Sequence, residues 1–175
     1  LQKHLALIAQ SGAGKSYCVS VLLEELLSRN KEQGQIAVIA FDTHGEYTCF
    51  GEPTNEKKDF SNVTKVIDAS KIKISLANTP KHFLEKVLSS LTPVQKRELF
   101  RIINKLKLEM RSGVGPFGID AVRAEVNELD SKTSVPLNFA LDDLTKMNLF
   151  AKVDSPAVMD LLKPGELLVI DLNGI

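Results

Sequence analysis

Several features are scarce in this chain of 175 residues. It has no tryptophan, only two cysteines, Cys18 and Cys49, and no apolar run approaching the roughly 20 residues that span a bilayer. Two cysteines 31 positions apart support neither a disulfide framework nor a zinc knuckle. Net charge is absent too, because 22 Lys and Arg residues balance 22 Asp and Glu residues. We therefore expect a soluble, cytoplasmic protein with no membrane segment, in which any nucleic-acid binding depends on a local patch of charge.

The composition is that of a globular domain, with 43% hydrophobic and 25% charged residues. The length fits one domain, or one domain that carries an insertion. Charge is uneven along the chain: residues 81–111 contain eight basic and three acidic residues, whereas residues 113–160 contain four basic and eight acidic ones. The basic stretch could contact phosphates, although a solvated helical face is the simpler interpretation.

Apolar patterning predicts an α/β fold with a mostly parallel sheet. Residues 4–9 and 36–41 read as buried strands around a helix at 15–29, a pattern typical of a right-handed crossover between parallel strands. A block of about 70 residues with helical patterning then interrupts the sheet. Further strands are predicted at 64–68, 71–76 and 167–171, the first two near a sheet edge, and helices at 80–91, 93–111, 119–129, 136–149 and from 154. We expect a fragment of a larger protein.

A phosphate-binding motif follows the first predicted strand. Residues 9–16 read AQSGAGKS, the P-loop pattern GxxxxGK[ST] with Ala9 in place of the first glycine. Gly12 and Gly14 let backbone N–H groups turn toward a phosphate, Lys15 supplies positive charge for the β- and γ-phosphates, and the Ser16 hydroxyl is a ligand for Mg²⁺. A glycine-rich turn with a chance Lys-Ser is the alternative, but the predicted strand and helix on either side favour nucleotide binding.

A second motif, DTHGEY at residues 42–47, follows the next predicted strand. Ligands collect at the carboxyl ends of parallel strands, so Asp42 should lie on the same edge as the P-loop and hold a magnesium-bound water. Glu46 could orient or deprotonate the water that attacks the γ-phosphate. An Asx-turn with an exposed histidine is the structural alternative. The DxxG motif of small GTPases also fits residues 42–45. That family, however, needs a switch segment and a further strand between Lys15 and Asp42, where this chain has room for one helix and one strand only, and the guanine-reading Asn-Lys-x-Asp is lacking.

Taken together, HLALIAQSGAGKSYCVSVLLEELL, FDTHGEY and PGELLVIDLNGI resemble the HerA family of hexameric ATPases, which are relatives of the FtsK DNA pump. The resemblance implies a RecA-like core over residues 1–78 and 153–175 with a helical insertion at 79–152. It implies a homo-hexameric ring that uses ATP and Mg²⁺ to move along double-stranded DNA. Relatives work with the nuclease NurA in DNA end processing and repair, or in phage defence. The nucleotide-binding residues implied are Ser11, Gly12, Ala13, Gly14, Lys15, Ser16 and Tyr17, with Ser16 and Asp42 as metal ligands and Lys15, Asp42 and Glu46 as catalytic residues.

The strand at 167–171 ends in Asp171 and looks like a Walker B strand, but in the family it resembles the strand before Walker B. No glutamate follows Asp171, so we expect this fragment to bind nucleotide more readily than it hydrolyses it. A structural role for Asp171, capping the loop that follows, remains open. An arginine finger from a neighbouring subunit is also expected, but nothing selects among Arg97, Arg101, Arg111 and Arg123. The alternatives to a motor are a small-molecule kinase and an ATP-binding assembly domain without turnover.

Overall fold

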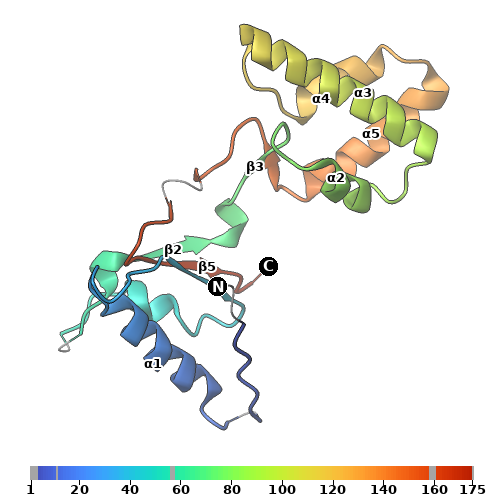
Figure 1. The fold of residues 1–175 in the computed structure, drawn as a ribbon. Helices are drawn as coiled ribbons and strands as arrows, with labels where there is room; N and C mark the ends of the chain where they lie inside the picture. The colour runs from blue at the N-terminus through green and yellow to red at the C-terminus, as the bar shows by residue number, and fades with distance from the viewer. Residues whose placement is uncertain (1–3, 11, 56–57, 158–160, 175) are drawn as a thin grey trace. The chain divides into compact units, whose positions relative to one another are not determined.

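The computed structural model describes residues 4–10, 12–55, 58–157 and 161–174. It divides into two compact units (Figure 1). One unit contains Leu1–Ala69 and Val158–Ile175, and we call it the sheet unit. The other contains Ser70–Ala157, and we call it the helical unit.

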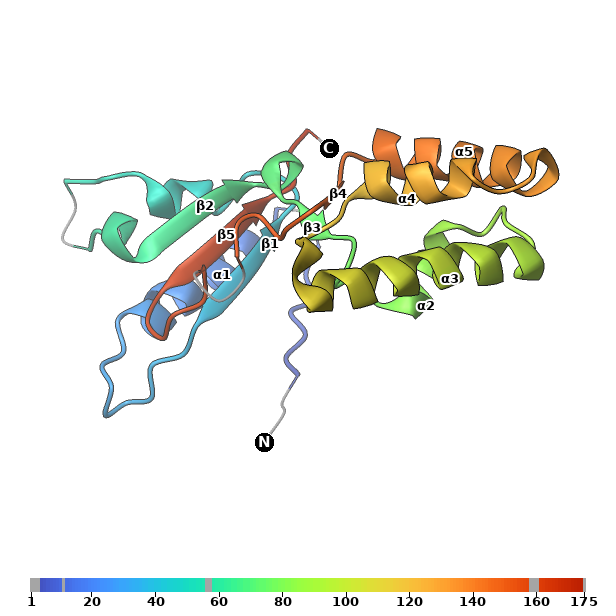
Figure 2. The same ribbon diagram turned by 90° about the horizontal axis from the view of Figure 1, so that it is seen from above.

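The sheet unit is built on three parallel strands, β1 (Val38–Asp42), β2 (Thr64–Asp68) and β5 (Leu167–Asp171). Their order is β1-β5-β2, so the last strand in the chain lies in the centre (Figure 2). Four consecutive apolar residues, 167–170, occupy this central strand, as expected for a strand that has a neighbour on each side. The register places Asp42, Asp171 and Asp68 side by side at the carboxyl ends of the three strands.

One long helix, α1 (Lys15–Leu27), packs against this sheet. Leu23 and Leu27 lie one helical turn apart and form a buried cluster with Leu167 and Val169 of the central strand. Three short 3₁₀ helices, η1 (Thr48–Gly51), η2 (Ser61–Val63) and η3 (Ala69–Lys71), flank β2. Phe50 and Phe60, whose ring centroids are 6.0 Å apart, extend the same cluster. A single face of α1 and a few sheet residues therefore make up this core.

The strand predicted at residues 4–9 is wrong. Residues 4–10 form no strand and are exposed, with 95% of Ile8 and 75% of Leu5 accessible to solvent. These residues pair with none of the described strands, so their backbone groups have no ladder partner and their side chains no buried face. Since residues 4–10 form no strand before α1, the predicted crossover from residues 4–9 to 36–41 is not formed either. The parallel pairs of the sheet are instead those that β5 makes with β1 and β2.

The helical unit contains four helices, α2 (Lys81–Val87), α3 (Pro93–Glu109), α4 (Ile119–Asn127) and α5 (Ser131–Lys146), and a π-turn at Met110–Val114. A core of 17 buried residues joins the helices, and Leu99, Val122 and Leu137 in it have no exposed surface. Two short strands, β3 (Ile74–Ser75) and β4 (Phe150–Ala151), pair in parallel. In the part of the chain that the structure describes, no helix has the length and apolarity to cross a membrane.

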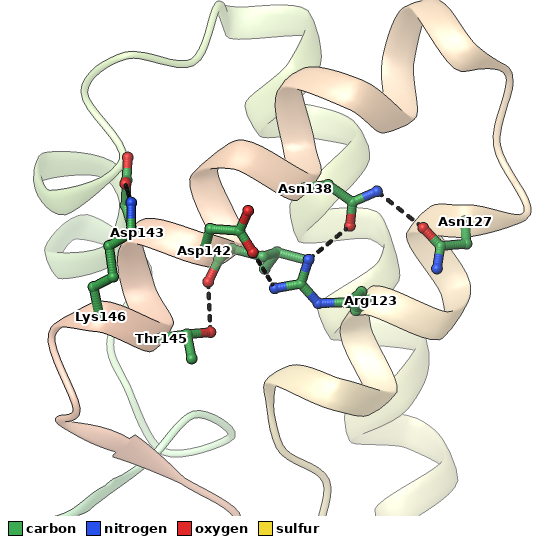
Figure 3. Close-up of polar contacts among 8 residues, drawn as sticks. Arg123, Asn127, Asn138, Asp142, Asp143, Thr145 and Lys146 are labelled. Atoms are coloured by element: carbon green, nitrogen blue, oxygen red, sulfur yellow. Dashed lines mark hydrogen bonds and ion pairs between the residues drawn. The ribbon is translucent and has the colours of Figure 1, made fainter.

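Polar side chains link α4 to α5 on the outside of that core (Figure 3). Arg123 donates to the Asp142 carboxylate at 2.7 Å and to the Asn138 side-chain oxygen at 3.2 Å. Asn138 in turn donates to Asn127 at 2.9 Å. Both partners of Arg123 lie on α5, so its side chain links α4 to α5 within the helical unit.

Three predicted elements of the helical unit differ from the structure. The strand predicted at 71–76 shortens to the two residues of β3, which pair with β4 in a separate sheet rather than at the edge of the main one. The helix predicted from Pro136 begins at Ser131, because the Asp130 carboxylate accepts from the backbone N–H groups of Lys132 and Thr133 and caps the helix there. The helix predicted from Asp154 is not formed over residues 154–157, and residues 158–160 lie outside the described part.

Candidate nucleotide site

The P-loop has the backbone of an anion cradle. Gly12 and Gly14 both have φ of +79°, a left-handed conformation that residues with a side chain rarely adopt. No atom lies within 4 Å of a Cβ at either position, so backbone conformation, not packing, is what requires glycine. The helix α1 then begins at Lys15 with no side-chain cap on its first N–H groups. These groups and the positive end of the helix dipole are suited to an anion such as phosphate.

A tight loop follows β1 and is organised by Asp42, which is only 2% exposed. One carboxylate oxygen accepts from the backbone N–H groups of His44, at 3.2 Å, and Glu46, at 3.1 Å; the other accepts from that of Tyr47, at 2.7 Å. Burial raises the pKa of Asp42, but the backbone donors together outweigh it, so that the pKa lies below its ordinary value of 3.8. These bonds are those of the Asx-turn alternative. The backbone N–H of Gly45 also contributes to lowering this pKa, so the loop backbone surrounds the carboxylate.

The loop delivers Glu46 to the P-loop. The Ser16 hydroxyl lies 2.8 Å from each of the two Glu46 carboxylate oxygens, which joins residues 30 positions apart in the chain. The hydroxyl is the donor in this contact, so its oxygen can still serve as an acceptor. Next to this contact, burial and the nearby charges of Glu46 and Asp42 raise the pKa of Tyr47 above its ordinary value, partly offset by a hydrogen bond with Ser16.

A cleft of about 530 Å³ lies between these two segments. Its described lining residues are Ala9, Gln10, Gly12, Gly14, Lys15, Ser16, Tyr17, His44 and Glu46. Six of the residues predicted for the site line this cleft together: Gly12, Gly14, Lys15, Ser16, Tyr17 and Glu46. Asp42 lies at the base of the loop, Ala13 is in the P-loop turn without lining the cleft, and Ser11 falls outside the described residues. Gln10 and His44 were not predicted, although both stand inside the two motifs.

The Asp171 side chain is bound to the backbone of its own loop. Its carboxylate accepts from the backbone N–H of Asn173 at 2.9 Å, which caps the loop after β5. Among the described residues, no group of three or more His, Cys, Asp and Glu side chains is placed to hold a metal ion. Cys18 and Cys49 are free thiols at the surface.

A parallel sheet, a glycine-rich turn and a helix that starts on a Lys-Ser pair are the features of a mixed α/β domain of the P-loop NTPase type. The family model described as "Helicase HerA, central domain" matches residues 1–175, so the chain belongs to that family. It is also similar to a protein of Methanocaldococcus jannaschii described as "Probable helicase MJECL08", with 42% identity over 45 residues. That match covers 26% of this chain and only 8% of the relative's length. The family is that of a helicase-type ATPase that uses a nucleotide.

Proposed function

We propose that this chain is the ATP-binding part of a motor that moves along double-stranded DNA. The observation that carries the proposal is the contact of Ser16 with Glu46 at 2.8 Å, which joins the P-loop to the loop after β1 in one cleft. A glycine-rich turn with a chance Lys-Ser does not explain why Ser16 contacts the Glu46 carboxylate. Nor does it explain why the buried Asp42 accepts from the backbone of Glu46. Family membership supports the motor, and the printed name of the relative supports a helicase type of activity.

In this proposal, the P-loop holds the triphosphate of ATP. Backbone N–H groups of residues 11–17 surround the β-phosphate, and Lys15 neutralises charge on the β- and γ-phosphates. Bound Mg²⁺ would reduce the charge of the phosphates, and the Ser16 hydroxyl and Asp42 are the residues that would hold it. Glu46 holds the Ser16 hydroxyl through the observed hydrogen bond. Its carboxylate would also orient the water that attacks the γ-phosphate.

The proposed core is RecA-like and comprises residues 1–78 and 153–175, with the helical insertion at 79–152. The boundaries of the two compact units, after residues 69 and 157, lie close to these positions. A homo-hexameric ring, a nuclease partner such as NurA, and work in DNA end processing and repair or phage defence complete the proposal. An arginine finger from the next subunit remains part of it; Arg123 is the least suited of the candidates, because its guanidinium is already paired with Asp142.

Calorimetry with the full-length protein tests the site. Lys15→Ala should weaken binding of Mg²⁺-ATP on the order of tenfold to a hundredfold, the loss expected for a hydrogen bond to a charged group. Lys31→Ala is the matched control, because Lys31 is an exposed lysine of the same unit outside the cleft. No heat of association of ATP with the parent protein, or equal losses in both variants, would contradict the proposal. Turnover stimulated by duplex DNA separates the motor from an assembly domain, and phosphate transfer by a monomer would instead indicate a kinase.

A further inference from the structure

We propose that a groove on the helical unit, between α2 and α3, binds the phosphate backbone of duplex DNA. This inference rests on the proposed motor, to which it adds a place of contact. The groove has a volume of about 920 Å³, larger than the P-loop cleft, and no residue of it belongs to that cleft. All of its described lining residues belong to the basic stretch at residues 81–111.

The groove carries a positive charge. Its described lining includes five basic residues, Lys81, Lys96, Arg97, Arg101 and Lys105, against two acidic ones, Glu85 and Glu98. The side chains of Arg97 and Arg101 are 74% and 66% exposed, so they can reach a ligand without rearrangement of the core. Part of this charge is paired, because Lys105 lies 2.7 Å from Glu125 of α4 and Lys81 lies 3.5 Å from Glu85. The basic residues still outnumber the acidic ones along the groove, and a local positive surface is the electrostatic footprint of phosphate binding.

The basic side chains of α3 form a row. Arg97, Arg101 and Lys105 are each four residues apart, which places them on one side of the helix at steps of about 6 Å. The row is therefore about 12 Å long. Lys105 is paired with Glu125 at 2.7 Å, so Arg97 and Arg101 are the members of the row that are open to a ligand. Duplex DNA carries about one phosphate charge for every 1.7 Å of its axis, so each of these arginines can contact a phosphate without any base being read.

Glu98 positions one of the guanidinium groups. Its carboxylate accepts from Nε of Arg101 at 2.9 Å, whereas Nε of Arg97 lies 4.0 Å away, beyond hydrogen-bond distance. The bond uses the inner nitrogen of Arg101, so the two terminal nitrogens keep their donors for a bidentate contact with phosphate. Glu98 therefore orders Arg101 but adds one negative charge to the groove, and its removal should strengthen DNA binding.

Duplex DNA fits the groove better than a single strand does. Single-stranded DNA is commonly held by aromatic side chains on which the bases stack. Among the groove residues that the structure describes, the one aromatic is Phe100, which is only 8% exposed and has the Lys81 ammonium 5.1 Å from its ring centroid. No stacking surface is thus offered there, and what the groove presents is charge. Contacts of this kind are made to the backbone and do not depend on sequence.

The test is DNA binding by the full-length protein, followed by fluorescence anisotropy with two labelled 20-base-pair duplexes of unrelated sequence between 50 and 200 mM NaCl. Arg97→Gln with Arg101→Gln should weaken binding to both duplexes on the order of tenfold to a hundredfold. The slope of log K against log salt should fall by about two, since about one counterion is released for each phosphate contact. Glu98→Gln should tighten binding by a few-fold. A single strand of the same length should bind more weakly than the duplex.

Lys132→Gln with Lys146→Gln is the matched control, because it removes the same charge from exposed positions of α5. Equal weakening in control and groove variant, or unchanged affinity in the groove variant, would overturn the inference. So would a groove variant that changes only the assembly state, because the groove would then hold the acidic face of a second copy. Stronger binding of single-stranded DNA would also overturn it. Calorimetry with Mg²⁺-ATP on the parent protein separates these outcomes from failure of the proposed function, since a parent protein that binds ATP keeps the proposed nucleotide site whatever the groove variant does.

Discussion

The two units of this chain are stabilised in different ways. The helical unit has a core of 17 buried residues, drawn from its four helices and the segments that connect them. The buried cluster of the sheet unit contains four residues, and its strand β1 leaves Phe41 68% exposed. The candidate site belongs to the sheet unit, where backbone N–H groups that donate to the buried Asp42 carboxylate organise the loop after β1. The candidate site and the larger apolar core thus lie in separate units.

The largest effect should come from the helical core. Leu99→Ala removes a side chain with no exposed surface and should lower the free energy of unfolding by about 2–5 kcal/mol, through lost burial and the cavity left behind. Urea denaturation followed by circular dichroism measures this loss. Leu108→Ala on the same helix is the control, because Leu108 is 64% exposed and should change stability by about 0.5 kcal/mol or less. Loss of ATP binding in Leu99→Ala at temperatures where it stays folded would contradict the separation of the two units.

A smaller effect is expected at Asp42. Asp42→Asn puts an amide N–H₂ where a carboxylate oxygen now accepts, so at least one buried backbone N–H of the loop loses its partner, at a cost of about 1–3 kcal/mol. Glu46 should then lose its position beside Ser16, and ATP binding should weaken together with stability. Urea denaturation at pH 7 and calorimetry with Mg²⁺-ATP measure the two effects. Full stability in the variant would show that the loop is held by something other than this carboxylate.

The same residue predicts a pH dependence. Because the pKa of Asp42 is lower in the folded chain than its ordinary value of 3.8, its ionised form stabilises the fold above that pH. The stabilisation is lost as the pH falls through the folded-state pKa. The difference in stability between the parent protein and Asp42→Asn should therefore be complete at pH 7 and shrink in acid below pH 3.8. A difference that stays constant down to the lowest pH at which the chain folds would contradict this assignment.

The smallest effect should be at the start of α3. Thr92 and Gln95 form a capping box, in which the Thr92 hydroxyl accepts from the Gln95 backbone N–H and the Gln95 side chain accepts from the Thr92 backbone N–H. Thr92→Ala should cost about 1 kcal/mol in the helical unit and leave the ATP site unchanged. Thr92→Ser keeps the hydroxyl and should retain most of the stability in the same urea titration.

Much of the fold was predictable because local patterns decide it. The strands at 64–68 and 167–171 have the predicted bounds, and the helix from Lys15 ends at Leu27, two residues before the predicted end. Residues 4–9 have an equally clear strand pattern, but a strand also depends on a partner, and the sequence does not say which edges of the sheet are already used. Similarly, Pro136 suggested a helix start, whereas the capping carboxylate of Asp130 lies six residues earlier.

The candidate site was predictable in its members but not in their contacts. Glycine spacing and the Lys-Ser pair follow from the motif alone, as does the place of Glu46 at the end of a strand. The contact between the Ser16 hydroxyl and Glu46 depends on the path of the loop after β1. Backbone N–H groups of the loop define that path by donating to the Asp42 carboxylate. The sequence left two roles open for Asp42, and the structure shows the bonds of an Asx-turn. Whether the same carboxylate also serves a metal remains part of the proposal.

The strand order β1-β5-β2 has a consequence for how the chain is made. The middle strand is the last of the three to leave the ribosome, about 100 residues after β2, and the whole helical unit is synthesised in between. The helices make mostly local contacts and can fold while synthesis continues, whereas β1 and β2 have no strand to pair with until β5 emerges. During synthesis we therefore expect a stage at which the helical unit is already folded while β1 and β2 still lack the strand that joins them.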